Sequence, residues 1–217
     1  MQPQFVYDVH TAKALRNSVS SPRLLRYEAF ATGDLVQALR LYTWNTALSE
    51  ALYGPIQGLE ITLRNKMNDC FASHFGPQWF DAPAMGLLYA QQDQVTQAKQ
   101  ALWRHRKAPD PDRVVAELSF GFWAGLFGRQ YETHLWRRYL RALFVNAPSP
   151  FLRQDAHRVL NNVRMLRNRI AHHEPILHRP LQGEYDSVLA AIDWLCMATA
   201  AWVGHHSRFG ETFAARP

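Results

Sequence analysis

The spacing of apolar residues constrains the fold of this chain most, because they recur every three or four positions along most of its length. After Pro55, for example, apolar side chains stand at Ile56, Leu59, Leu63 and Met67. This spacing puts them on one face of an α-helix, whereas a half-buried strand requires strict alternation. Proline and glycine separate the helical segments, and no segment alternates convincingly. The sequence therefore predicts an all-α protein.

Capping residues, prolines and glycines set the expected helix limits. Pro22 opens a short helix after a serine cap, and Asp34 caps a longer one. Gly54-Pro55 is expected to end that helix, because an internal proline removes a hydrogen bond and clashes with the preceding turn. The expected helices span residues 22–31, 34–53, 55–75, 91–106, 113–127, 131–144, 151–173 and 181–206.

The breaks between these helices leave no linker long enough for two independent domains. With 47% apolar and 19% charged residues, the composition is that of a globular protein. We expect residues 1–217 to form a single all-α domain, in which residues 1–20 are a loosely packed N-terminal segment.

The sequence also predicts where the protein works. No stretch approaches the roughly 20 apolar residues of a membrane span. The start, Met1 to Phe5, lacks the basic and apolar regions of a secretory signal. The two cysteines, Cys70 and Cys196, do not make a disulfide framework. We therefore expect a cytoplasmic protein with no membrane partner.

The positive charge of the chain is carried mainly by arginine. The net charge is +6, and lysine occurs only at Lys13, Lys66, Lys99 and Lys107. The planar guanidinium group binds phosphate through two hydrogen bonds at once, so an arginine-rich surface fits RNA or DNA. The alternative is that a genome rich in G and C replaces lysine by arginine throughout.

The segment most informative about function is residues 165–175. It contains the array R-N-x-x-x-H, formed by Arg167, Asn168 and His172, and it is stopped by Pro175. Arginine can hold a phosphate, and histidine can accept or donate a proton near neutral pH. Together the two residue types can support cleavage of a phosphodiester without a metal.

The helix that carries this array has two distinct faces. Its buried face is predicted to consist of Val159, Val163, Leu166 and Ile170. At about 100° per residue, one polar stripe should contain His157, Asn161, Arg164, Asn168 and His172. Most polar stripes are simply solvated. Solvated faces usually mix acids with bases, however, and no acid occurs between Asp155 and Glu174, which favours a phosphate-binding surface.

Four blocks of the chain match one known family in the same order. They are L-Y-x-W-N-x-A-L-S at 41–49, L-E-I-x-L-R-N at 59–65, E-L-S-F-G-F-W at 117–123 and R-N-R-I-A-H-H-E-P-I at 167–176. On these blocks the chain resembles the Abi-like (abortive infection) family, a branch of the HEPN superfamily of small α-helical proteins. The resemblance extends from about residue 21 to residue 202.

The resemblance implies a HEPN-like helical bundle with additional helices, forming a homodimer with the motif at the dimer groove. Active family members cleave RNA without a metal. Carried over, Arg167 would hold the scissile phosphate, His172 would move protons, and Asn168 would orient the histidine or contact phosphate. Attack by the 2′-hydroxyl leaves a cyclic phosphate and spares DNA. The implied role is that of a toxin or phage-defence effector.

Further residues are assigned around this centre. Arg164 and His173 are predicted to contact RNA, although His173 could be only a surface or capping residue. In the family interpretation, the helix bearing Glu60 and Arg64 faces the motif helix, so this pair would support Arg167 or His172. The simpler interpretation is an ion pair between positions i and i+4 of one helix.

Metal binding is not indicated by the sequence. His172, His173, Glu174 and His178 do not place two ligands one turn apart on one helix face, as zinc sites on helices do. We expect no metal and no cofactor. The expected partners are RNA, a second copy of the chain and an antitoxin or regulatory protein. The rival functions are non-catalytic RNA binding and a toxin–antitoxin interaction.

Overall fold

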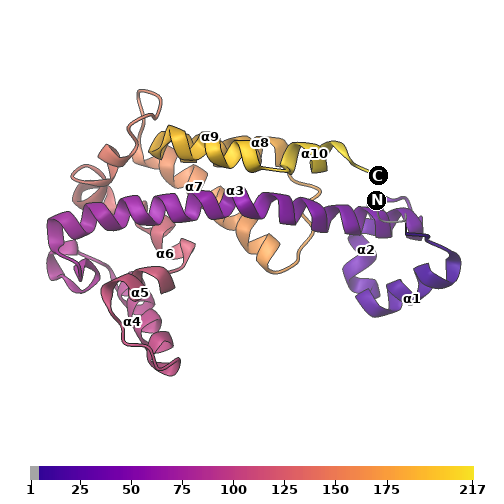
Figure 1. Ribbon diagram of the computed structural model, residues 1–217, viewed down its shortest axis with the longest axis horizontal. Helices are drawn as coiled ribbons and strands as arrows, with labels where there is room; N and C mark the ends of the chain where they lie inside the picture. The colour runs from indigo at the N-terminus through magenta and orange to yellow at the C-terminus, as the bar shows by residue number, and fades with distance from the viewer. Residues whose placement is uncertain (1–4) are drawn as a thin grey trace.

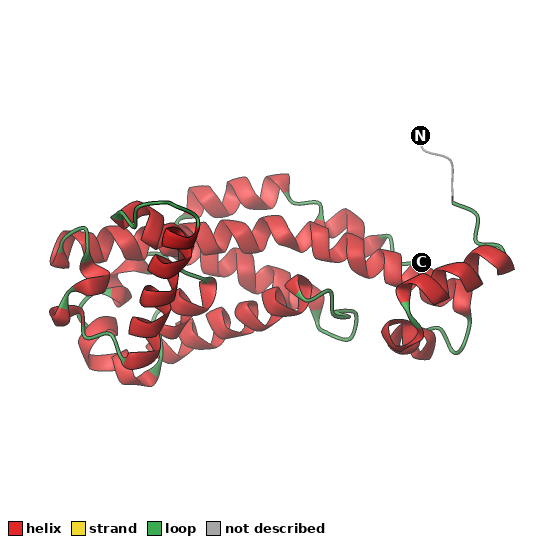
Figure 2. Cartoon of the chain, turned by 90° about the horizontal axis from the view of Figure 1, so that it is seen from below, coloured by secondary structure: helices red, strands yellow, loops and turns green. Residues whose placement is uncertain are grey.

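The computed structural model describes residues 5–217, and these residues form helices without any strand (Figures 1 and 2). The predicted all-α class is confirmed. Residues 1–4, part of the segment inspected for a secretory signal, lie outside the described residues. The α-helices are α1 (Val9–Val19), α2 (Ser21–Phe30), α3 (Leu35–Phe75), α4 (Tyr89–Arg104), α5 (Pro111–Glu117), α6 (Phe120–Gly125), α7 (Arg153–Ala171), α8 (Leu181–Leu195), α9 (Met197–His206) and α10 (Phe209–Ala214).

Helix α3 runs along the long axis of the molecule, straight through the position of a predicted break (Figure 1). It contains 41 residues with Pro55 inside it, so it extends over about 60 Å. The prediction that two helices meet at Gly54-Pro55 is wrong. The proline costs about 3 kcal/mol, but Leu52, Pro55 and Ile56 are all buried. Burial of several such side chains, at about 1.5–3 kcal/mol each, outweighs that cost.

Two hydrophobic clusters lie along α3. The larger one, the main cluster, joins α3 to α6, α7 and α8, and its fully buried aromatic side chains include Phe71, Trp79, Phe122 and Trp123. The smaller one, the N-terminal cluster, joins α1, α2 and the start of α3 through Ala12, Leu24, Tyr27, Ala31, Ala38, Leu39 and Leu41. Trp44 and Leu177 pack against both clusters, so the two adjoin.

Helix α1, which begins at Val9, is only lightly anchored to the rest of the molecule. Asp8 caps α1, and its Oδ1 accepts a hydrogen bond from the backbone N–H of Thr11 at 2.8 Å. Ala12 is the one residue of α1 that is buried. The segment expected to be loosely packed is therefore helical over Val9–Val19 and contributes little to the core.

The helix predicted over residues 113–127 is divided into α5 and α6. Leu118 between them has an extended backbone, and Ser119 Oγ accepts a hydrogen bond from the backbone N–H of Phe122 at 3.4 Å. A serine that caps the second helix in this way ends the first, because a capping residue lies outside the helical region.

The helix predicted over residues 131–144 is wrong as well. This segment consists of short 3₁₀ and π turns at Arg129–Tyr131, Glu132–Trp136 and Leu140–Leu143. Arg153 of α7 binds the segment by donating to the carbonyl of Phe127 at 2.6 Å and to Oε2 of Glu132 at 2.7 Å. These tertiary hydrogen bonds compete with a regular helix, and the sequence pattern does not reveal them.

The last predicted helix is interrupted at Cys196, where the backbone is extended, and α10 follows without having been predicted. Beyond the interruption, α9 comes very close to α3. A Cβ atom added to Gly58 would lie 2.8 Å from Cγ2 of Val203, so the glycine permits this contact. No helix within residues 5–217 combines the length and the apolar character that a membrane span requires.

Candidate functional site

Helix α7 presents the motif on a partly exposed face. Val163 and Leu166 are buried, while Val159 and Ile170 are half-buried against the main cluster. The predicted apolar face of the motif helix is thus confirmed. The helix packs against α3, α6 and α8, and its C-terminal turn carries the exposed side chain of Arg167.

The motif histidines end this helix. His172 is the C-cap residue, and His173 adopts a left-handed backbone with φ of 56°. The N–H of His173 donates to the carbonyl of Ile170 at 3.0 Å, and the N–H of Glu174 donates to that of Arg169 at 2.8 Å. This is a Schellman cap, whose left-handed position is usually glycine. A histidine there costs on the order of 1 kcal/mol of backbone strain.

Two hydrogen bonds from distant parts of the chain hold the segment after α7. Arg23 of α2 donates from Nη1 to the carbonyl of His173 at 3.1 Å. Asn45 of α3, only 5% exposed, accepts at Oδ1 from the backbone N–H of Ile176 at 2.8 Å. The motif end is therefore fixed to both α2 and α3. Neither residue was predicted to belong to the site.

A groove of about 650 Å³ runs between α3 and the end of α7. Arg167 and His173 line it from one side, and Glu60 and Arg64 line it from the other. Four of the predicted site residues therefore meet in one depression, and the α3 segment that carries Glu60 and Arg64 does face the motif helix. The groove thus combines two carboxylates, those of Glu50 and Glu60, with the two guanidinium groups of Arg64 and Arg167.

The simpler interpretation of Glu60 and Arg64, an ion pair within one helix, is not realised. Arg64 instead donates from Nε to Oδ1 of Asn65 at 3.2 Å, and no ion pair joins it to Glu60 among the described side chains. Both charged groups consequently remain available to a ligand or to Arg167 across the groove.

His172 and Asn168 lie outside the lining of this groove. The N–H of His172 donates to the carbonyl of Asn168 at 2.9 Å, so the two residues are one turn apart, as predicted. His172 is exposed and Asn168 is half-buried. Five positions along a helix correspond to a rotation of about 140°. Arg167 therefore faces the groove, while His172 projects from the opposite flank of the same helix end.

Arg164 is held within its own helix. Its Nε and Nη2 atoms donate to Oδ1 of Asn161 at 3.2 and 2.9 Å, and its Cδ lies 3.9 Å from the position of a Cβ on Gly121. The side chain is half-buried. Contact between Arg164 and RNA would require it to exchange the bond to Asn161 for one to phosphate.

Positive charge gathers around the loop that follows α7. Arg169 pairs with Glu174 at 3.1 Å, and Arg179 pairs with Glu184. Burial lowers the pKa of His178 below its ordinary value, and the nearby charges of Arg169, Arg26 and Arg179 lower it further, against an opposing effect of Glu184. Cations thus outnumber acids at this end of the site.

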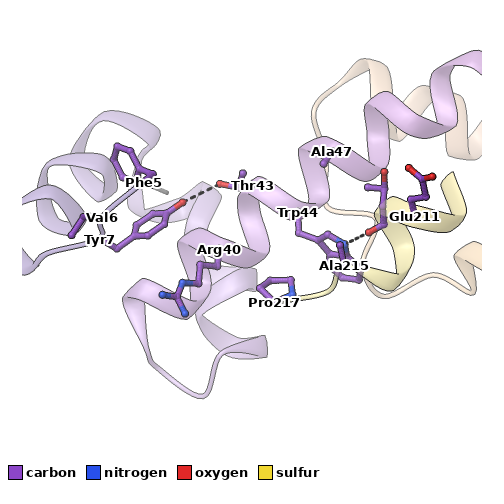
Figure 3. A pocket seen from close by; sticks show the side chains of 11 residues that line it. Phe5, Val6, Tyr7, Arg40, Thr43, Trp44, Ala47, Glu211, Ala215 and Pro217 are labelled. Atoms are coloured by element: carbon purple, nitrogen blue, oxygen red, sulfur yellow. Dashed lines mark hydrogen bonds between the residues drawn. The ribbon is translucent and has the colours of Figure 1, made fainter. Parts of the chain in front are cut away.

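A second hollow lies away from the motif, where residues 5–7 and the segment after α9 meet α3 (Figure 3). It encloses about 1000 Å³. Tyr7 Oη lies 3.5 Å from Thr43 Oγ1, and the indole N–H of Trp44 donates to the carbonyl of Thr212 at 2.7 Å (Figure 3). These polar groups already pair with one another, and none of the predicted site residues lines this hollow.

Metal ligands do not converge at the motif. Within residues 5–217, no three side chains of the types His, Cys, Asp and Glu gather as they do around a metal ion.

Comparison with models of protein families, with curated protein sequences and with solved structures found no match to this chain. The function of the site is consequently inferred from its own residues.

Proposed function

We propose that this chain is a metal-independent endoribonuclease of HEPN type, acting as a toxin or phage-defence effector. The observation that carries the proposal is the end of α7, where exposed Arg167 and His172 precede a segment that hydrogen bonds from α2 and α3 hold in place. The resemblance of the four sequence blocks, 41–49, 59–65, 117–123 and 167–176, points to the same class.

Arg167 is the group that binds the scissile phosphate. Its side chain is exposed at the groove, and it makes no ion pair with any described residue, whereas its neighbour Arg169 is paired with Glu174. A free guanidinium can hold two phosphate oxygens and stabilise the charge that develops on them. Arg64 lines the same groove and supplies a second guanidinium, while Glu50 and Glu60 also line it.

His172 moves the protons. In the cleavage step its neutral imidazole accepts the proton of the 2′-hydroxyl, whose oxygen attacks the phosphorus. The bond from phosphorus to the 5′-oxygen breaks, the leaving oxygen takes up a proton from water, and the imidazolium returns its proton to the solvent. The products are a 2′,3′-cyclic phosphate and a 5′-hydroxyl. Asn168, one turn earlier on the same flank, orients the imidazole.

A homodimer is part of this proposal. One chain presents Arg167 to its groove and His172 to the opposite flank, so a second copy supplies the surface that completes the site. Apolar side chains of α3 remain exposed in the lining of the groove, with Tyr53 at 61% and Ile61 at 39% exposure. Burial of such side chains stabilises an interface between subunits.

The test is cleavage of single-stranded RNA in EDTA, with the product ends identified. Wild type should release cyclic phosphate ends, and His172→Ala should be slower by about 10²–10⁴-fold, the usual contribution of proton transfer. Arg167→Ala should lose about 10²–10³-fold, as expected for one charge-stabilising group. Both side chains are exposed, so thermal unfolding should stay within about 0.5 kcal/mol of wild type.

His105→Ala is the matched control. His105 is also an exposed histidine at a helix C-cap, with φ of −87° and ψ of 11° beside −94° and 10° for His172. It ends α4 and does not line the groove that holds Arg167. Equal loss of cleavage in both variants would contradict the assignment of His172.

The rival function is RNA binding without catalysis. It is favoured by the separation of His172 from the groove that holds Arg167. In that case wild type leaves RNA intact and still retains it on a gel, and His172→Ala binds as tightly as wild type. Loss of binding in Arg167→Ala would then place the bound strand in the groove.

A further inference from the structure

The N-terminal hairpin formed by α1 and α2 reaches the motif end of α7, although the two are far apart in the sequence. The hydrogen bond from Arg23 to the carbonyl of His173 spans 150 positions. Leu177, just beyond the motif, packs against the N-terminal cluster. In Figures 1 and 2 the hairpin forms one end of the molecule, and the loop that follows α7 lies on the side of the bundle toward it.

The hairpin directs arginines toward this loop. Leu24 and Tyr27 are buried, while Arg23 and Arg26 are exposed on the adjoining face of α2. Residues three positions apart lie about 60° from each other around a helix, so both arginines occupy one face. The charge of Arg26 is among those that lower the pKa of His178 in the same loop, after the larger effects of burial and of Arg169.

These two arginines have no acidic partner among the described residues, in contrast to the other arginines around the loop. Arg169 is paired with Glu174, and Arg179 is paired with Glu184. The nearest acid on α2, Glu28, is bound by Arg16 at 2.9 Å. Positive charge that is left uncompensated on one helix face is the feature that attracts a polyanion.

We propose that Arg23 and Arg26 of α2 bind the phosphate backbone of RNA beside the motif, so that the N-terminal hairpin holds the strand that flanks the cleavage position. This inference rests on the proposed action on RNA and adds the path of the substrate. The strand passes from the groove at Arg167, over the loop that follows α7, to the exposed face of α2.

Arg26→Gln is the decisive variant, because Arg26 makes no hydrogen bond or ion pair within the described residues, and its removal leaves the motif loop in place. Arg23→Lys is the companion, since it keeps the charge while weakening a two-point phosphate contact. Arg104→Gln combined with Arg129→Gln is the control. Both of these are exposed arginines without an ion pair among described residues, and they lie on other elements.

The measurement is the affinity of the full-length chain, in the His172→Ala background, for a fluorescent single-stranded RNA at several salt concentrations. Arg26→Gln should weaken binding about tenfold, the effect of one charge-assisted hydrogen bond. It should also lower the slope of log affinity against log salt by about 0.7. The control pair should leave both quantities unchanged.

Other results overturn the inference in distinguishable ways. An unchanged affinity and slope in Arg26→Gln, with RNA still cleaved by wild type, would refute the path over α2 and leave the proposed function standing. Failure of the wild-type protein to bind or cleave any RNA would contradict both the path over α2 and the proposed function. Displacement of the RNA by polyglutamate as effectively as by unlabelled RNA would indicate an acidic protein partner instead. Displacement by inorganic phosphate at low concentration would indicate a small-anion site.

Discussion

The main cluster and the N-terminal cluster differ in what they contribute, and the motif end of α7 lies where they adjoin. The main cluster is built around fully buried aromatic side chains such as Phe71 and Trp123, whereas the N-terminal cluster consists mostly of alanine and leucine. Stabilisation grows with the apolar area removed from water. The larger cluster therefore supplies most of the stability, while the smaller one places Arg23 at the motif. The main cluster thus stabilises the fold, and the N-terminal cluster positions the site.

The largest expected effect comes from removing one buried side chain from each cluster, which tests whether the two clusters differ in their contribution to stability. Phe71 and Leu24 are both fully buried. Phe71→Ala should lower the free energy of unfolding by about 3–5 kcal/mol, which corresponds to a fall in Tm of roughly 10 °C. Circular dichroism during heating measures it.

Leu24→Ala should act locally. We expect faster amide exchange in α1 and α2, with protection in α8 preserved, because a small cluster can open without global unfolding. If Leu24→Ala lowers Tm as much as Phe71→Ala and α8 loses its protection too, the two clusters unfold as one unit and the comparison fails.

A smaller effect is expected at the buried anchor Asn45. Asn45→Leu leaves the N–H of Ile176 buried without an acceptor, which should cost about 1–3 kcal/mol. Amide exchange of residues 174–177 should rise, because the loop after the motif loses its attachment to α3. Asn162→Leu is the control, since Asn162 is exposed on α7 and a change there should stay within about 0.5 kcal/mol. Equal destabilisation by the two substitutions would show that the hydrogen bond from Ile176 to Asn45 does not contribute to the free energy of unfolding.

The smallest expected effect is a gain in stability. His173→Gly relieves the left-handed backbone at φ of 56° and should raise the free energy of unfolding by about 0.5–1 kcal/mol. Thr32→Gly is the matched control, because Thr32 is exposed and also left-handed, with φ of 52°. A gain in Thr32→Gly together with a loss in His173→Gly would show that the imidazole makes contacts worth more than the strain.

The sequence predicted those parts of the fold that depend on local periodicity. The all-α class and the buried face of α7 follow from apolar spacing, which packing then uses directly. The continuity of α3 through Pro55 does not follow, because it depends on burial by distant helices. The irregular segment at 129–143 depends on hydrogen bonds from Arg153, which no local pattern indicates.

The site also contains residues that could be predicted from the sequence and residues whose partners are defined only by distant contacts. Only the family resemblance predicted that Glu60 and Arg64 support Arg167, and the three residues share one groove. The partner of Asn45 could not be predicted, although an asparagine in line with Leu41, Leu48 and Leu52 already indicates a buried polar group. Arg23 gives no sequence signal, since its partner is defined only by the folded chain.

The separation of the two anchors also sets an order of events during synthesis. Arg23 and Asn45 precede their partners by 150 and 131 positions. At 5–20 residues per second, they leave the ribosome roughly 7 to 30 s before those partners. For that interval the growing chain contains α1, α2 and α3 but no fixed motif. Any action of this site on RNA begins only after most of the chain has left the ribosome that makes it.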